Sequence, residues 1–353
     1  MRLEKRTEVS PAALVIAPIG AVAFTLVVSS LLVLWAGAPV GPTWAALLRG
    51  GFGSVFAWSE TLTRATPLIF TGLAVTVAFK ARLFNIGVEG QLYGGALAAV
   101  AVGGLHGGSG FDAPPALLFF LMVCAAAMAG ALLLLGPALL KAKLGVDEVV
   151  TTLLLNFIVL LGVSALLDGP MKDPTAMGWP QSVGLLPQLE LGKLVAGTRV
   201  HTGLLAASAL AVLLWGFFKY TLPGFDIRAT GANAAAARFA GVPVTRTVVM
   251  VALLSGALAG LAGAVEVAGR TGYVTLDMSP GYGYTGIVIA MLAALNPLAV
   301  VAAGVFVAGV LVGADSMSRA INVPTYIADV IVAASLISVL VATMLTQYKV
   351  RRA

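Results

Sequence analysis

The sequence is poor in charged residues, cysteine and histidine. Only 10% of its 353 residues are Asp, Glu, Lys or Arg, against about a quarter in soluble globular domains, whereas 59% are hydrophobic. This balance excludes an ordinary water-soluble protein. Cys124 is the single cysteine, which excludes an internal disulfide, and we expect it to be a small buried apolar residue. His106 and His201 are expected in loops without ligand partners nearby, so no metal site is predicted.

The sequence also lacks the motifs of ATP hydrolysis and of the common hydrolases. It contains no GxxxxGK[ST] phosphate loop, no HExxH and no GxSxG. Gly281–Gly286 (GYGYTG) matches GxGxxG, but it opens an apolar run instead of joining a strand to a helix. We therefore expect a chain that is not an enzyme, with no catalytic residue, no ATP site and no bound cofactor.

Long apolar runs fill most of the chain. About 20 apolar residues suffice to cross a bilayer. Hydropathy predicts ten spans: 12–36, 66–83, 86–105, 115–140, 148–167, 202–219, 246–268, 282–295, 297–314 and 325–346. The predicted fold class is an all-α polytopic membrane protein of about ten transmembrane helices, forming a single domain over residues 1–353.

The basic residues predict the orientation. If the N-terminus is cytoplasmic, fourteen of the 21 Lys and Arg residues fall in inside segments, as the positive-inside rule requires. Both termini, 1–11 and 347–353, and the loop 220–245 are then cytoplasmic. Segment 168–201 lies outside; it is rich in proline and glycine and serves either as a docking surface or as an ordinary loop. Basic residues form no dense tract with aromatics, so no nucleic-acid partner is predicted.

A polar stretch, Phe84–Gln91 (FNIGVEGQ), separates two of the apolar runs. A polar backbone break at membrane depth is tolerated only where protein buries it or where it lines a cavity. Asn85, Glu89 and Gln91 are therefore candidates to line a solute path. A short cytoplasmic turn, with a structural Glu89, remains the alternative.

A second polar group opens the run that begins near Glu148. Thr152 and Asn156 lie four residues apart, so a helix places both on one face, where they can line a polar path or bond to a neighbouring helix. Farther along, Gly256 and Gly260 have GxxxG spacing, which favours close helix packing.

Gly224–Val242 (GFDIRATGANAAAARFAGV) is too short and polar to cross the membrane. Asn233 is a good helix N-cap, an alanine run follows it, and Gly241 is a good helix stop. The segment predicts one or two short helices on the cytoplasmic face that dock to a soluble partner, against the alternative of a solvated loop.

Four motifs, in this order, give the sequence a family resemblance: NIGVEGQ (85–91), DEVVTTLLLNF (147–157), GPMKDP (169–174) and GANAAAARFAG (231–241). Together they resemble the permease subunits of ATP-binding-cassette (ABC) importers for nucleosides and simple sugars, the ribose and basic-membrane-lipoprotein group. The likeness runs from about Pro67 to the C-terminus. It departs at Gly231-Ala232-Asn233, where ribose-type members have GGN.

The resemblance implies a transport subunit in the bacterial plasma membrane that moves a nucleoside or related neutral solute by alternating access. It implies three protein partners: a second related permease in a heterodimer, a cytoplasmic ATPase that holds ATP-Mg, and an extracytoplasmic substrate-binding lipoprotein. Membrane lipid is a further expected partner. It assigns ATPase coupling to the loop that carries Gly231, Asn233, Ala236, Arg238 and Gly241. The competing hypothesis is an ion-driven secondary transporter, which usually needs acidic residues within its spans.

Overall fold

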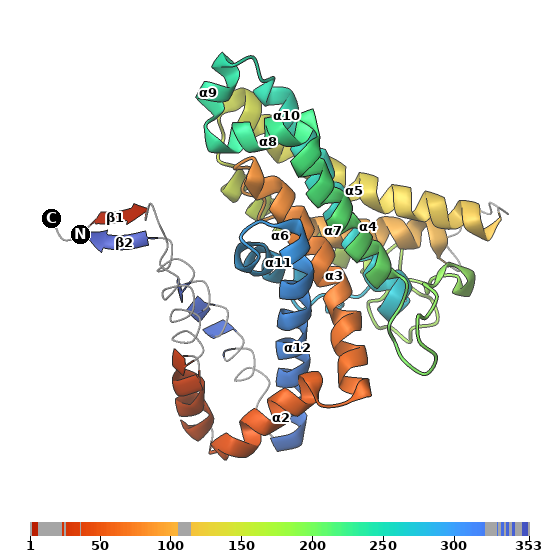
Figure 1. Ribbon diagram of the computed structural model, residues 1–353. Coiled ribbons are helices and arrows are strands. Elements are labelled where there is room, and N and C mark those ends of the chain that lie inside the picture. Colours follow the sequence, from red (N-terminus) through yellow and green to blue (C-terminus); the bar gives the residue numbers. More distant parts are fainter. Residues whose placement is uncertain are drawn as a thin grey trace. The chain divides into compact units, whose positions relative to one another are not determined.

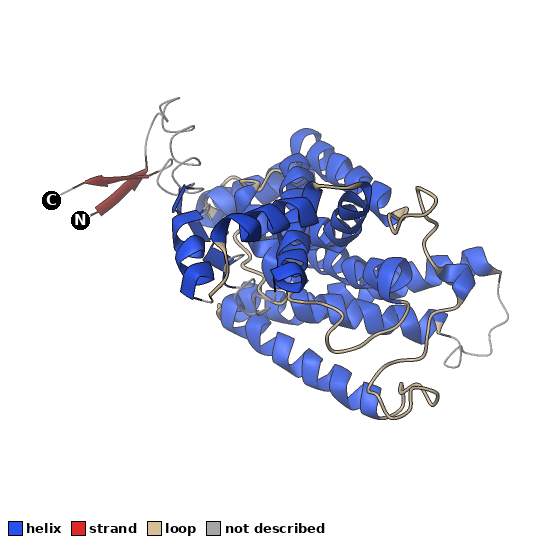
Figure 2. Ribbon diagram, turned by 90° about the horizontal axis from the view of Figure 1, so that it is seen from below, coloured by secondary structure: helices blue, strands red, loops and turns tan. Residues whose placement is uncertain are grey.

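The computed structural model describes residues 2–5, 23–24, 26–35, 37–104, 114–321, 330, 333–334, 337–338, 341–342 and 348–351. Most of these residues are helical (Figure 2). The helices are α2 (Val40–Phe52), α3 (Val55–Lys80), α4 (Val88–Gly103), α5 (Pro115–Leu144), α6 (Glu148–Asp168), α7 (Gly203–Tyr220), α8 (Leu222–Ala232), α9 (Ala234–Phe239), α10 (Val244–Glu266), α11 (Tyr282–Leu292) and α12 (Pro297–Ile321), with the short 3₁₀ turn η1 (Pro187–Leu189) and the π-helical turn η2 (Val267–Thr271). Two strands, β1 (Arg2–Lys5) and β2 (Tyr348–Arg351), pair antiparallel. The chain divides into two compact units, 1–61 with 306–353 and 62–305.

Six helices in the described residues are long and apolar enough to cross a membrane: α3, α5, α6, α7, α10 with η2, and α12. The number is seven if helical residues Leu26–Trp35 and α2, which meet at a bend of 116°, form one span. Two predicted spans coincide with shorter helices, α4 and α11, and the predicted span 325–346 falls mostly outside the described residues, as does much of 12–36. The chain is thus a multi-pass helical membrane protein, and the count of ten remains a prediction.

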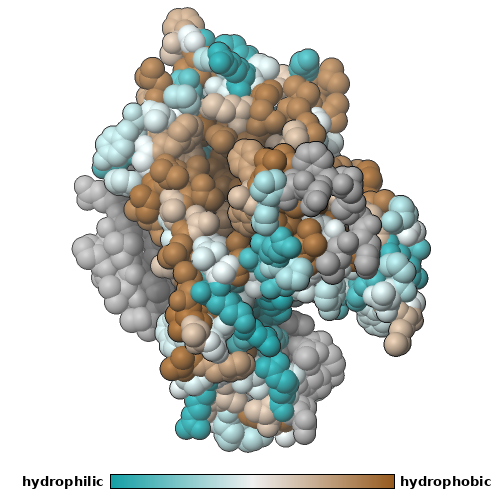
Figure 3. Space-filling model, turned by 90° about the vertical axis from the view of Figure 1, so that its right-hand side faces the viewer, coloured by the Kyte–Doolittle hydropathy of each residue, from teal (hydrophilic) through white to brown (hydrophobic). Residues whose placement is uncertain are grey.

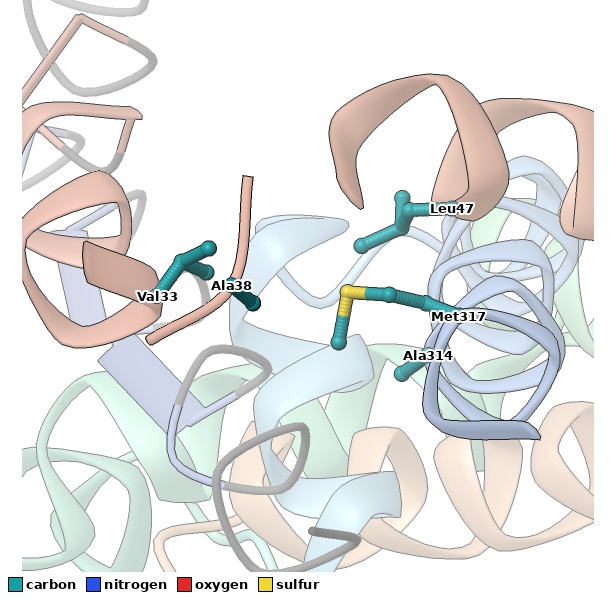
Figure 4. Close-up of a cluster of buried hydrophobic side chains, with 5 residues drawn as sticks. All are labelled: Val33, Ala38, Leu47, Ala314 and Met317. Atoms are coloured by element: carbon teal, nitrogen blue, oxygen red, sulfur yellow. The ribbon is translucent and has the colours of Figure 1, made fainter. Parts of the chain in front are cut away.

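In the first unit, α2 packs against the C-terminal half of α12. Figure 4 shows Met317 pointing between Leu47 and Ala314, with Val33 and Ala38 completing a buried apolar cluster. The unit therefore has an apolar core of its own.

In the second unit, glycines bring α10 close to α4 and α5. A Cβ on Gly260 would lie 2.1 Å from the carbonyl oxygen of Ala126, and one on Gly95 would lie 2.2 Å from that of Gly260. A Cβ on Gly256 would lie 2.4 Å from the carbonyl oxygen of Gly130. The predicted packing role of the GxxxG pair is confirmed.

Local sequence explains where the helices of this unit begin and end. Gly145 adopts a left-handed φ of 68° and ends α5. Asp147 then caps α6, because its side chain accepts a hydrogen bond from the backbone N–H of Val149 at 2.8 Å. Thr221 caps α8 in the same way through the N–H of Gly224. Figure 1 shows α8 and α9 together at one end of this unit.

Much of the outer surface is apolar. Hydrophobic residues cover broad areas of the face in Figure 3, and the exposed side chains include Phe157 on α6 and Leu213 on α7. Such a surface suits lipid or another membrane subunit.

Cys124 belongs to this exposed set, so the prediction that it is buried was wrong. A long apolar run does not show which of its faces the protein covers.

Candidate functional site

Residues 81–87 between α3 and α4 form a non-helical break that side chains hold in place. Asn85 is fully buried; its Nδ2 donates to Oε1 of Gln91 at 2.9 Å and to Oγ of Ser255 at 3.2 Å. Gln91 Nε2 donates back to Asn85 Oδ1 at 3.0 Å. Ser255 is the middle residue of α10, so the break reaches the level at which that span is half complete.

Side chains of α6 pair with the backbone of this break. Thr152 Oγ1 accepts from the N–H of Ile86 at 3.1 Å, and Asn156 Oδ1 accepts from the N–H of Gly90 at 2.8 Å. Asn156 Nδ2 donates to the carbonyl of Ile86 at 2.9 Å and to the hydroxyl of Tyr284 at 3.2 Å. The backbone groups that the break leaves without helical partners are thus paired within the protein, as buried amides require.

Glu148 extends this row of side chains by one helical turn. Its Oε1 accepts from the N–H of Phe84 at 3.1 Å and forms an ion pair with Lys141. Lys141 also donates to the carbonyl of Arg82 at 2.6 Å. Glu148 was not among the predicted path residues, although its spacing of four from Thr152 places it on the same helix face.

Glu89 joins the starts of α4 and α11. It lies in the first turn of α4, is 3% exposed, and its Oε2 accepts from the N–H of Gly283 at 2.5 Å. Gly283 is the second residue of α11, where backbone N–H groups have no helical partner. A protein carboxylate therefore caps the helix that the GxGxxG match opens. A carboxylate at this end is also favoured by the helix dipole.

The structure thus brings all five predicted path residues to one buried place. Each bonds to protein in this conformation: Asn85, Glu89, Gln91, Thr152 and Asn156. The sequence analysis did not assign Ser255 and Tyr284 to this site, because nothing in the sequence relates α10 and α11 to the break. We name these five residues together with Glu148, Ser255 and Tyr284 the break network.

The predicted docking segment forms the two short helices α8 and α9. Asn233 Oδ1 accepts from the N–H groups of Ala235 and Ala236 at 3.0 and 3.1 Å, so Asn233 is the N-cap. Gly241 follows α9 with a left-handed φ of 88°. The cap and the stop predicted from sequence are confirmed. Arg238 on α9 is exposed, and Phe239 is 95% exposed, which is unusual for a large apolar side chain outside the spans.

Gly231 packs α8 directly on the end of α3. A Cβ at Gly231 would lie 1.9 Å from the carbonyl oxygen of Lys80, a backbone atom that cannot rotate away. Lys80 is the last residue of α3 and precedes the break. The pair α8 and α9 therefore contacts α3 directly before the break.

At the opposite end of α10, Glu266 and Arg270 form an ion pair. Arg270 Nη1 donates to Glu266 Oε1 at 2.5 Å and to the hydroxyl of Tyr282 at 3.0 Å. Glu266 is 1% exposed. Its pairing agrees with the high cost of burying a lone carboxylate.

The predicted outside loop lies beside this pair. It is mostly non-helical, as expected, and its backbone bonds to η2 and the residues after it, for instance Leu191 N to Ala268 O at 2.8 Å. A pocket of about 620 Å³ opens between loop and η2. His201, expected in a loop, lies just before α7; it is 2% exposed, and its ring lies against Gly203 and Gly269. Burial lowers the pKa of His201 to about 4.

Fold and site define a multi-pass membrane protein with a buried helix break and a capped surface helix pair at one end. Residues 57–340 match the family described as "Branched-chain amino acid transport system / permease component". The chain belongs to this family of transport components. Its predicted membership of the ABC importer permeases is confirmed.

Named relatives carry several substrates. The guanosine ABC transporter permease protein NupP of Bacillus subtilis is 35% identical, over 90% of each chain. The glucose ABC transporter permease protein TsgB13 of Haloferax volcanii is 39% identical over 84% of this chain and 79% of its own. The nucleoside ABC transporter permease protein NupB of Lactococcus lactis is 29% identical over 91% and 89%.

Proposed function

We propose that this chain forms half of the solute path of an ABC importer and carries a nucleoside or a related neutral solute. The observation that supports the proposal is that the exposed, capped helices α8 and α9 contact the end of α3, which leads into the buried break at residues 81–87. A solute path opened by a separate ATPase needs both parts and a connection between them.

The coupling surface is the exposed side of α9 and its flanks. Asn233, Ala236, Arg238 and Gly241 shape it, buried Gly231 holds α8 against α3, and Phe239 adds an apolar anchor for a pocket on the ATPase. The N-cap and the C-terminal glycine hold six residues helical, a length that would be marginal in isolation. A preformed helix binds at a lower entropic cost than a loop that must first become ordered.

Force applied to α9 reaches the path through backbone contacts. α8 carries it to Lys80 through Gly231, and Lys80 leads directly into residues 81–87. Asn85, Glu89, Gln91, Thr152 and Asn156 border the path and hold the break in one of its two arrangements. ATP-bound and ATP-free partners favour different arrangements, which is the requirement for alternating access.

A neutral solute suits the chemistry of the break network. Its amides and hydroxyls donate and accept hydrogen bonds, while the carboxylates of Glu89 and Glu148 are engaged by the N–H groups of Gly283 and Phe84 and by Lys141. A nucleoside presents the same neutral hydrogen-bonding groups. The guanosine and nucleoside permeases among the relatives support this class, and the glucose permease TsgB13 makes a sugar the alternative substrate.

The assembly we propose has the chain N-in and C-in with ten spans, in the bacterial inner membrane. α8 and α9 meet an ATPase that holds ATP-Mg, and segment 168–201 meets a substrate-binding lipoprotein. A second, related permease completes the path. The guanosine and nucleoside systems support a heterodimer, since NupP with NupQ, and NupB with NupC, each resemble this chain.

The test is uptake into vesicles that contain this chain and the products of its neighbouring transport genes. Radiolabelled guanosine, ribose and leucine are compared with and without ATP, and with and without an ion gradient. We expect guanosine uptake that requires ATP and stops when the ATPase is omitted. Uptake by this chain alone under an ion gradient would instead establish the secondary transporter.

A further inference from the structure

A small basic pocket lies at the end of the second unit that carries α8. Its volume is about 240 Å³, and it lies between the C-terminal ends of α3 and α7, the middle of α8, and the turn from α11 to α12. Lys80, Lys219 and Arg228 contribute three positive charges, and no acidic residue lines it. The break network and the α9 surface do not use these side chains.

The pocket is suited to an anion. None of its three cations forms an ion pair among the described residues, and the charges of Lys80 and Arg228 repel each other. Asn296 and Pro297, at the start of α12, also line the pocket. Like charges held together without a counter-charge raise the energy of the empty site, and a phosphate would lower it.

The residues around the pocket are of the kinds found at a membrane surface. Lys219 Nζ lies 4.8 Å from the ring centroid of Trp215 and 5.0 Å from that of Tyr220, and Tyr220 is 70% exposed. Trp and Tyr gather at headgroup level, where lysine also extends its amine toward water. Beside them Leu222 and Phe225 are 81% and 53% exposed, so apolar side chains that can contact acyl chains border the basic pocket.

We propose that this pocket binds the phosphate headgroup of an anionic phospholipid. The carbonyl of Lys80 also contacts Gly231, so a bound lipid would lie beside the contact between α3 and α8. Basic pockets between spanning helices on the cytoplasmic side select anionic headgroups by this electrostatic means. Binding is a property of the pocket and does not depend on which solute the protein carries.

The test uses the purified transporter complex and counts retained lipid by native mass spectrometry. Phosphatidylglycerol is compared with phosphatidylcholine of the same acyl chains. The variant Lys219→Gln/Arg228→Gln removes two exposed cations; Lys143→Gln/Arg246→Gln removes two other exposed cations and is the matched control. We expect about 30-fold weaker phosphatidylglycerol binding in the pocket variant and about fivefold in each single variant, with no change in the control.

Three results would overturn the proposal. Equal loss of phosphatidylglycerol in variant and control would show nonspecific charge attraction. Displacement of the lipid by inorganic phosphate would show that the pocket takes a soluble anion. Unchanged lipid binding with loss of the ATPase subunit from the complex would show that the pocket faces that partner. Uptake is measured separately, so failure of the transport assignment leaves the lipid result interpretable.

Discussion

The carboxylate of Glu89 and the backbone N–H of Gly283 are 2.5 Å apart, although 194 residues separate them in the chain. This contact ties the first turn of α4 to the first turn of α11, so two helices that begin after non-helical segments begin at one place. Positive helix ends that meet need a negative group between them. Glu89 supplies it.

Glu89→Ala should destabilise the protein, because it leaves the N–H of Gly283 buried without its acceptor. An unsatisfied buried group costs about 1–3 kcal/mol. Glu89→Gln keeps an acceptor oxygen and should retain most of the stability. Thermal unfolding of the purified protein measures both, with the exposed Glu190→Ala as control. Equal melting temperatures for Glu89→Ala and wild type would refute the capping role.

Thr152→Val should destabilise the protein more than Thr151→Val. Thr152 accepts a hydrogen bond from the break at Ile86, whereas the hydroxyl of Thr151 bonds only to carbonyls of its own helix turn. We expect a loss of about 1–2 kcal/mol for Thr152→Val and under about 0.5 kcal/mol for Thr151→Val. The two variants have the same change in volume, so equal melting temperatures would show that the contact to the break adds no stability.

The sequence predicted the membrane class and the two short helices α8 and α9 well, because their signals are local. Apolar length marks a span, and Asn233 and Gly241 mark the limits of α9 within a few residues. Thr152 and Asn156 were identified for the same reason, since residues four apart must share a helix face. Their partners were not predicted, because the bond from Asn85 to Ser255 joins segments 170 residues apart.

Which residues of a span are buried could not be predicted from the sequence, because the spanning helices are apolar on every face. Nothing local distinguishes Cys124, which is exposed, from a buried neighbour such as Met122. The packing of Gly231 on α3 was not predicted either. A glycine in a polar loop predicts a turn or flexibility, whereas here it permits contact with a carbonyl of another helix.

Gly231→Ala should disturb the joint between α8 and α3. Its Cβ would overlap the carbonyl of Lys80, so α8 must move away. We expect a lower melting temperature and weaker stimulation of ATP hydrolysis by solute-loaded binding protein. Gly216→Ala on α7 is the control, because a Cβ there meets nothing within 4 Å and a helical alanine is favoured by about 1 kcal/mol. If Gly231→Ala shows the same stimulation of ATP hydrolysis as the wild type, the contact between Gly231 and Lys80 does not connect α8 to the break.

Arg238→Glu and Phe239→Ala should leave the fold intact and reduce coupled uptake. Both side chains are exposed on α9 and make no contact that the second unit needs. Exposed anchors of this kind lose about 1–2 kcal/mol of binding free energy when truncated, which is about a 5- to 30-fold weaker association with the ATPase. Phe157→Ala, an exposed phenylalanine on α6, is the control. Normal ATPase binding and uptake in both α9 variants would disprove the docking assignment.

His201 should make the segment 168–201 sensitive to acid. The folded pKa of about 4 lies below the ordinary value of 6.5, so the unfolded chain binds the proton more readily between these values. The contribution of neutral His201 to the free energy of unfolding is therefore fully present above about pH 6.5. It is lost as the pH decreases toward 4, by up to about 3 kcal/mol. His201→Gln cannot titrate in this range, and its melting temperature should change less between pH 7 and pH 5 than that of the wild type. If both proteins lose the same stability over that interval, carboxylates elsewhere cause the acid sensitivity, and the buried imidazole does not control the loop.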